Sequence, residues 1–114
     1  MSECIFCRII EGTLEAKKVY EDALCVAFDD VNPQAPVHVL VIPKQHVESL
    51  KECQEGDAAL LGHLLQTCTT VAKQKEISEA GYRVIANTGK GAGQTVFHLH
   101  LHVLGGRILR WPPG

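Results

Sequence analysis

The feature that most constrains the fold is a strict alternation of histidine and aliphatic residues in FHLHLHVL, the segment that begins at Phe97. Three histidines occupy every second position: His98, His100 and His102. The positions between them are aliphatic: Leu99, Leu101 and Val103. Alternate side chains of a strand point to opposite faces, so the aliphatic set faces a core and the imidazoles form a row on the other face. A slip of one residue would bury three imidazoles in the core, so the pattern also fixes the register.

Other segments predict the partners of this strand. Residues 19–28 are mostly apolar with a turn at Glu21 and Asp22, and residues 37–42 are apolar apart from His38. A polar loop with two prolines, residues 29–36, separates them. The stretch that starts at Tyr82 reads as strand, glycine-rich loop and strand, which predicts an antiparallel hairpin with the histidine segment.

Residues 57–76 predict one long helix. Apolar residues at helical spacing form a stripe that consists of Leu60, Leu61, Leu64, Leu65, Cys68, Val71 and Ala72. Gly81 lies shortly after the expected end of the helix. Because strand pairs flank one helix, the sequence predicts an α+β fold, an antiparallel sheet with the helix on one face, in a single domain over residues 1–114.

Composition narrows the class of protein. The net charge of −2 and the pI of about 6.3 argue against a nucleic-acid duplex as partner. No segment approaches the roughly 20 apolar residues of a membrane span, and the polar start of the sequence does not match a signal peptide, so a cytoplasmic protein is expected. Five cysteines, an odd number, argue against a disulfide framework. Cys25 and Cys68 lie in apolar contexts and are interpreted as inert core residues.

Three interpretations compete for the histidine row. The imidazoles hold a catalytic metal, or one of them attacks phosphorus while the others orient it, or they form a solvated face without chemistry. The glycine-rich loop NTGKGAGQT, residues 87–95, adjoins the row. Glycines permit the backbone torsions that let several N–H groups bind one anion, although an ordinary flexible loop has the same composition. This adjacency would bring phosphate oxygens beside His100 and favours attack on phosphorus.

At this level of detail a family resemblance is clear. HLHLHVL has the His-φ-His-φ-His-φ-φ form of the histidine triad (HIT) superfamily. The segments FDDVNPQAPVHVLVIPKQH, GYRVIANTGKGAGQTVFHLHLHVLGG and the terminal WPPG resemble, in order, segments of its histidine triad nucleotide-binding (Hint) branch. The resemblance covers nearly all of residues 3–114. It implies a HIT-like fold: a five-stranded antiparallel sheet with one long helix and a shorter N-terminal helix, joined in a homodimer into a ten-stranded sheet.

The resemblance also implies a reaction, the hydrolysis of the P–N bond of adenosine 5′-monophosphoramidates through a covalent nucleotidyl-histidine, with release of AMP and an amine. His100 matches the nucleophile of the family, His98 and His102 the flanking triad members, and His38 a fourth histidine behind them. The positions that match nucleotide contacts are Ile5, Phe6, Ile9, Phe28, Asp30, Val31, Leu40, Asn87, Gly93, Thr95, His100 and His102. Taken one by one, the apolar members are equally consistent with ordinary core and Asp30 with a turn. No metal or other cofactor is required for this chemistry.

A structural zinc site is a separate expectation. Cys4 and Cys7 form a Cys-x-x-Cys pair, which alone is half of a zinc site or simply two thiols. Some HIT proteins resemble this chain in having a Cys₂His₂ set, with His46 and His98 as the matching histidines. In Hint proteins the C-terminus reaches the partner subunit's active site, so Trp111 is expected to contact the partner there.

Two alternatives remain open beside the phosphoramidase. One is a non-catalytic nucleotide-binding regulatory or interaction protein, and the other is a HIT hydrolase or transferase acting on dinucleoside polyphosphates. The triad, the GGR that follows it and the terminal WPPG favour the Hint branch.

Overall fold

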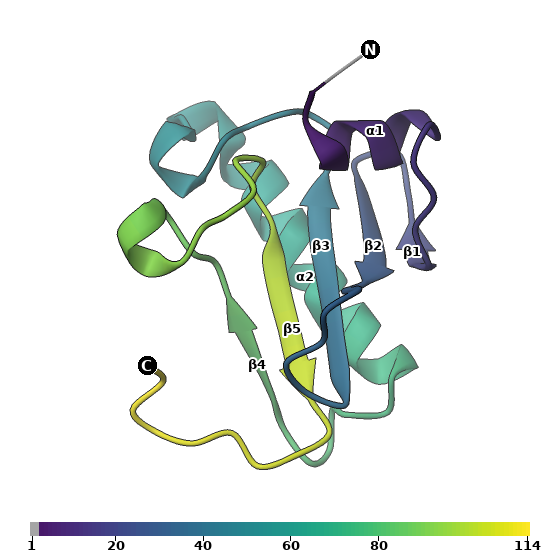
Figure 1. The fold of residues 1–114 in the computed structure, drawn as a ribbon, viewed down its shortest axis with the longest axis vertical. Helices are drawn as coiled ribbons and strands as arrows, with labels where there is room; N and C mark the ends of the chain where they lie inside the picture. Colours follow the sequence, from purple (N-terminus) through teal and green to yellow (C-terminus); the bar gives the residue numbers. More distant parts are fainter. Residues whose placement is uncertain (1–2) are drawn as a thin grey trace.

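The computed structural model describes residues 3–114, which form one five-stranded antiparallel sheet in the order β1-β2-β3-β5-β4 (Figure 1). The strands are β1 (Lys18–Glu21), β2 (Cys25–Asp29), β3 (Val37–Pro43), β4 (Tyr82–Ile85) and β5 (Leu101–Gly105). The helices are α1 (Ile5–Glu11) and α2 (Ala58–Gln74), with short 3-10 turns at Leu50–Glu52, Glu55–Asp57 and Lys90–Ala92. The expected α+β fold, with a long helix and a shorter N-terminal helix, is confirmed.

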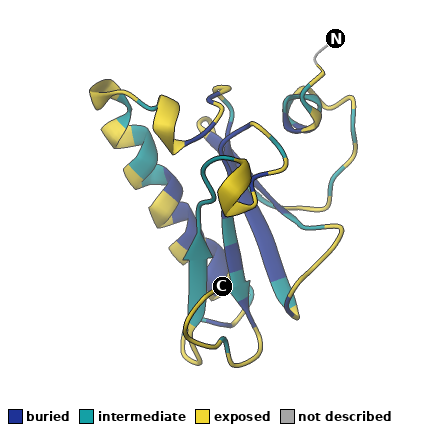
Figure 2. Cartoon of the chain, turned by 60° about the vertical axis from the view of Figure 1, so that its left-hand side comes forward, coloured by how far each residue is buried: buried dark blue, intermediate teal, exposed yellow. Residues whose placement is uncertain are grey.

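Helix α2 covers one face of the sheet, as Figure 2 shows, with its buried side turned to the strands. Its buried apolar residues are Leu64, Cys68, Val71 and Ala72, and they pack on Cys25, Ala27, Val39, Val41, Leu101 and Val103 of the strands. The assignment of Leu65 to the apolar stripe was wrong, because this side chain is 54% exposed. Leu65 follows Leu64 by about 100° around the helix, which turns it away from the sheet.

The opposite face carries helix α1 at one end. Phe6 and Ile9 of α1 pack on a second cluster of sheet residues, which consists of Val26, Phe28, Leu40 and Ile42. The helix stops at Gly12, whose φ of 85° gives the left-handed C-cap that glycine adopts without strain. Strand β3 thus sends alternate side chains to the two faces, as its sequence predicts.

Two predicted strands differ in extent. Residues 19–28 form two strands, because both Leu24 and Cys25 donate their backbone N–H groups to Asp22 Oδ1 and close a tight turn. Strand β5 pairs with β4 as the predicted hairpin, but it begins only at Leu101. The preceding Leu99 N–H donates to Val47 O at 2.6 Å, outside the sheet. Leu99 is buried in the α2-side core all the same, so the predicted facing holds beyond the strand.

Within residues 3–114, no helix has both the length and the hydropathy that crossing a bilayer requires.

Candidate functional site

The three histidines of the triad lie on the sheet face opposite α2 but do not form one uniform row. Only His102 belongs to β5, while His98 and His100 lie in the segment leading into the strand. The rings of His100 and His102 are 5.0 Å apart between centroids. His98 is fully buried and His100 is 6% exposed, which excludes a solvated face for these two.

His100 is held in one tautomer by the chain itself. Its Nδ1 lies 2.7 Å from the carbonyl oxygen of His98, which can only accept, so Nδ1 carries the proton and donates. Burial lowers the pKa of His100, so the ring is neutral near pH 7. The Phe6 ring packs edge-on against the imidazole at 5.1 Å and limits its rotation. His100 therefore keeps an unprotonated Nε2, the form needed for a nucleophile.

His102 is fixed by a second chain of hydrogen bonds. The backbone N–H of Gln34 donates to His38 Nδ1 at 3.0 Å, which places the proton of His38 on Nε2. That Nε2 lies 2.9 Å from His102 Nδ1 and 3.3 Å from Asp30 Oδ2. When His102 Nδ1 accepts this proton, the His102 hydrogen must sit on Nε2. His102 Nε2 is buried and has no hydrogen-bond partner among the described residues, so an acceptor from a bound molecule would satisfy it.

These histidines line a cavity of about 710 Å³, a size suited to a ligand as large as a nucleotide. Its walls include eleven of the twelve positions predicted to contact nucleotide: Ile5, Phe6, Ile9, Phe28, Asp30, Val31, Leu40, Gly93, Thr95, His100 and His102. The lining combines apolar side chains with a carboxylate, imidazoles and part of the glycine-rich loop. Val31 lies at the rim, almost fully exposed. Asn87, the twelfth position, is half-buried and is not among the described lining residues.

Two glutamines of this site were not foreseen. Gln94 is buried, accepts from Gly89 N–H at 2.8 Å and donates to Glu48 O at 2.7 Å. It thereby folds the glycine-rich loop, where Gly89 and Gly93 have φ values of 84° and 92°. Gln34 acts through its backbone amide, which no side-chain pattern reveals. The position of a long polar residue directly after the last glycine of the loop was the only available signal for Gln94.

The four predicted zinc ligands, Cys4, Cys7, His46 and His98, lie together in one cluster. Cys4 Sγ lies 3.4 Å from His98 Nδ1, and Cys7 Sγ lies 3.3 Å from His46 Nδ1. The two Nδ1 atoms are 3.1 Å apart, and all four ligand atoms lie within 4.8 Å of one another. Ligand atoms around a tetrahedral zinc are separated by about 3.3–3.8 Å, given bonds of about 2.0 and 2.3 Å. The donor set therefore fits a zinc ion.

His98 is oriented for that cluster and not for the cavity. Its Nε2 donates to Pro43 O at 2.9 Å, which leaves Nδ1 with a lone pair toward the cysteines. Metal-binding histidines commonly have this second hydrogen bond. His98 is not among the described residues that line the cavity.

A further group, Asp22 with Cys25 and His63, is a closed structural network. Besides the two backbone amides of its turn, Asp22 accepts from the Tyr20 hydroxyl at 2.8 Å and from His63 Nε2 at 2.7 Å. Burial alone would raise the pKa of Asp22, but these four donors lower it well below the ordinary value. Burial raises the pKa of Cys25 to about 11 and that of Cys68 to about 12, which agrees with inert core thiols.

Trp111 lies in the C-terminal segment, 81% exposed, with the Arg83 guanidinium 5.9 Å from its ring centroid. It is not among the described residues of the cavity wall, so within one chain it is remote from the histidines.

Comparison with known proteins gives a consistent picture. A family model described as the HIT domain matches residues 11–109. An uncharacterised HIT-like protein of Synechococcus elongatus is 57% identical over 115 residues, covering 100% of both chains. The crystal structure of a HIT family hydrolase from Legionella pneumophila has a TM-score of 0.96 and 44% identity, with 98% of this chain and 100% of that one covered. A HIT family hydrolase from Clostridium thermocellum gives 0.94 and 46%, with 96% of each chain covered.

Proposed function

Because this chain belongs to the HIT domain family, we propose that it is a purine nucleoside phosphoramidase. In this proposal it hydrolyses the P–N bond of adenosine 5′-monophosphoramidates to AMP and an amine. The observation that carries the proposal is the pair of neighbouring imidazoles in the cavity. His100 is held with a free Nε2 lone pair, and His102 is held with an unpartnered Nε2–H. One is a nucleophile and the other a hydrogen-bond donor to the group under attack.

The cavity accommodates the rest of the substrate. The base lies between the apolar walls formed by α1 and by Phe28 and Leu40. The Asp30 carboxylate accepts from the ribose hydroxyls, and the loop at Gly93 and Thr95 takes the phosphate. An apolar pocket with a few placed polar groups is typical of nucleotide-sized ligands.

In the first step His100 Nε2 attacks the α-phosphorus, a P–N bond to the histidine forms, and the P–N bond to the amine breaks. The departing nitrogen needs a proton, because an amine anion is a very poor leaving group. His102, which lines the cavity, has the buried Nε2–H without a partner among the described residues, whereas His98 is turned toward Cys4 and Cys7. His38 keeps its own Nε2–H, and through the 2.9 Å contact with His102 Nδ1 it stabilises the charge that His102 carries until the second step returns the proton. Positioned proton transfer typically accelerates such a step by about 10²–10⁴-fold.

In the second step water attacks the phosphorus of the nucleotidyl-histidine. The proton of this water passes to His102 Nε2, the P–N bond to His100 Nε2 breaks, and AMP leaves with both imidazoles restored to their neutral forms. The carbonyl oxygen of His98 stabilises the positive charge that His100 carries in the intermediate, because it accepts from Nδ1–H throughout.

Incubation with adenosine 5′-phosphoramidate tests this function. The expected result is release of AMP and ammonia, with a nucleotidyl adduct on His100 in rapidly quenched samples by peptide mass spectrometry. Diadenosine polyphosphates under the same conditions are expected to react more slowly. Faster cleavage of the P–O–P substrates would favour a dinucleoside-polyphosphate hydrolase. Tight AMP binding without turnover of either class would favour a non-catalytic nucleotide-binding protein.

We also propose that Cys4, Cys7, His46 and His98 hold a structural zinc ion. Zinc there would join the N-terminal segment to the end of β3, beside His98 and Pro43. Elemental analysis of protein purified without chelator is expected to give about one zinc per chain, and Cys7→Ser to lose it together with thermal stability. Cys53→Ser, which alters a half-buried thiol outside the cluster, is the control.

We also propose a homodimer, because β4 is an edge strand that is only partly buried. This strand is the edge of the sheet next to β5, and all four of its residues are only partly buried. Pairing of two β4 edges would give the ten-stranded sheet and cover the exposed backbone groups. Sedimentation is expected to give a dimer mass. In such a dimer Trp111→Ala is expected to change the preference among amine leaving groups, and unchanged preference would contradict the partner contact.

A further inference from the structure

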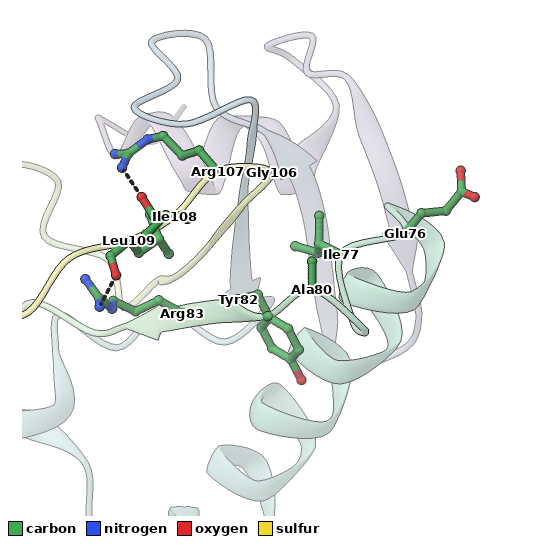
Figure 3. A pocket seen from close by; sticks show the side chains of 10 residues that line it. Glu76, Ile77, Ala80, Tyr82, Arg83, Gly106, Arg107, Ile108 and Leu109 are labelled. Atoms are coloured by element: carbon green, nitrogen blue, oxygen red, sulfur yellow. Dashed lines mark hydrogen bonds between the residues drawn. The ribbon is translucent and has the colours of Figure 1, made fainter.

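Two arginines attach the C-terminal segment to the sheet beside a cavity of about 570 Å³ (Figure 3). Arg83 of β4 donates to Arg110 O at 3.0 Å and to Leu109 O at 3.5 Å. Arg107 donates to Ile108 O at 3.0 Å. Each guanidinium thus holds a carbonyl of the same segment, and both side chains are at least partly exposed.

Of the two arginines, only Arg107 also donates to a carbonyl outside the C-terminal segment. Its other terminal nitrogen donates to Gln34 O at 3.0 Å, on the loop between β2 and β3. Gln34 in turn donates its N–H to His38 Nδ1 at 3.0 Å. A continuous chain of hydrogen bonds therefore runs from an exposed arginine through Gln34 and His38 to His102 at the histidine cavity.

The position of this loop matters because the His38 Nε2–H has two acceptors. His102 Nδ1 lies at 2.9 Å and Asp30 Oδ2 at 3.3 Å. Both favour a proton on Nε2, but only the His102 contact fixes the His102 tautomer. The Gln34 amide holds the other edge of the imidazole and so determines toward which acceptor the N–H points.

We propose that Arg107 is a positioning residue that keeps His102 in its Nε2–H tautomer through Gln34 and His38. Without the Arg107 contact, Gln34 shifts, the His38 ring turns toward Asp30 and His102 Nδ1 loses its donor. His102 then distributes its proton between both nitrogens and presents a lone pair to the cavity in part of the molecules. The effect on turnover rests on the proposed phosphoramidase function, whereas the effect on the tautomer does not.

Long-range ¹H–¹⁵N imidazole NMR at pH 7.5 on the ¹⁵N-histidine-labelled protein tests this directly. In the wild type and in Arg83→Met, which loosens the same segment without touching Gln34, His102 is expected to be the Nε2–H tautomer. In Arg107→Met the two His102 nitrogens are expected to shift toward each other, as in a mixture of tautomers. Gln34→Ala removes the bond from Gln34 Nε2 to Asn32 O but is expected to keep the wild-type tautomer, because the contacts with His38 and Arg107 are made by the backbone.

Kinetics on adenosine 5′-phosphoramidate give the second readout. Arg107→Met is expected to lower kcat about tenfold with KM changed less than about twofold, since the lost donor acts on the transition state. Arg107→Lys, which retains one donor toward Gln34 O, is expected to recover part of kcat and the wild-type tautomer. If Arg107→Met does not fold, Arg107→Ala takes its place, because it also lacks a donor toward Gln34 O and is expected to give the same mixture of His102 tautomers.

Wild-type His102 signals in Arg107→Met, or equal changes in Arg83→Met, overturn the proposal. If the wild type does not hydrolyse the phosphoramidate, the proposed function fails, and the NMR comparison still decides the role of Arg107.

Discussion

The two faces of the sheet are made by alternate residues of the same strands, yet they differ in composition. On the α2 face the described core residues of the strands are aliphatic or cysteine, and the helix closes over them. On the other face α1 covers only one end, and the histidines His38, His100 and His102 line a cavity. In β3 the change takes one position, because Val39 faces α2 while His38 faces the cavity. The alternation lets one face stabilise the fold while the other holds polar groups in place.

The largest expected difference between the faces is in turnover. His100→Ala removes the proposed nucleophile and is expected to lower kcat at least about 10³-fold. The apolar walls and Asp30 remain, so the Kd for AMP, measured by calorimetry, is expected to change only a few-fold. His63→Ala is the control, because His63 lies on α2 beside Asp22 and does not line the cavity. Wild-type turnover in His100→Ala, or equal losses in both variants, would remove His100 from the mechanism.

The next largest effect is on the free energy of unfolding, and here the α2 face is expected to matter more than the cavity face. Leu64 is fully buried against the sheet, so Leu64→Ala is expected to cost about 2–5 kcal/mol. Leu65→Ala, one residue further and 54% exposed, is expected to stay within about 0.5 kcal/mol. Urea titration measures both. Turnover by the folded fraction is expected to be unchanged in both variants, and a loss of kcat in folded Leu64→Ala would show that the two faces are coupled.

The sequence predicted the α2 face and the cavity face of the sheet to different extents. The facing of Leu99, Leu101 and Val103 was predicted correctly, because strand alternation survives even where the ladder hydrogen bonds are missing. The length of β5 was not, since the Leu99 N–H is taken by Val47 from another part of the chain. Leu65 was wrongly assigned to the buried side of the helix. The spacing of apolar residues does not show how much of the helix circumference the sheet covers.

On the cavity face, the positions could be predicted but the hydrogen-bond connections could not. Eleven of the positions that the resemblance predicts to contact nucleotide line one cavity. The proton positions depend on contacts between distant residues, such as His38 with His102, and on the backbone amide of Gln34. A backbone N–H is present in almost every residue, so no pattern of side chains indicates where one will be used.

The stability of the protein is expected to depend on pH through a residue of the cavity face, His102. Burial, followed by the neighbouring His100 and His38, lowers the pKa of His102 to about 4 from 6.5. Above about pH 6.5 the His102 ring is neutral in both the folded and the unfolded protein, so folding is not opposed by its protonation. As the pH falls from 6.5 to 4, the unfolded chain binds the proton more readily, and up to about 3 kcal/mol is lost.

His102→Asn is expected to reduce this loss, measured as the urea-derived free energy at pH 7.5, 6 and 5. Comparison with the wild type cancels the other groups that titrate, such as Asp22. A slope in His102→Asn equal to that of the wild type would mean that other groups cause the acid sensitivity.

The smallest expected effect is on the free energy of unfolding and concerns side-chain packing at the edge of the α2 face. Gly105 has no side chain, and a Cβ there would lie 2.7 Å from Ile77 Cδ1. Gly105→Ala is therefore expected to cost about 1–3 kcal/mol by overpacking. Gly62→Ala, at a position of α2 with nothing within 4 Å of the new Cβ, is expected to stabilise by about 0.5–1 kcal/mol.

Ile77→Val sharpens the test, because it removes the Cδ1 atom that the new methyl group would meet. In that background Gly105→Ala is expected to cost less, and the difference between the two costs, from a double-mutant cycle, measures the contact itself. The same cost in both backgrounds would mean either strain in the backbone of β5 or contact with Ile77 Cβ and Cγ2, which would lie 3.1 Å and 3.2 Å from the new Cβ and remain in valine. Since β5 also carries His102, such strain is expected to lower kcat as well, whereas a contact with Ile77 is confined to the α2 face and leaves kcat unchanged.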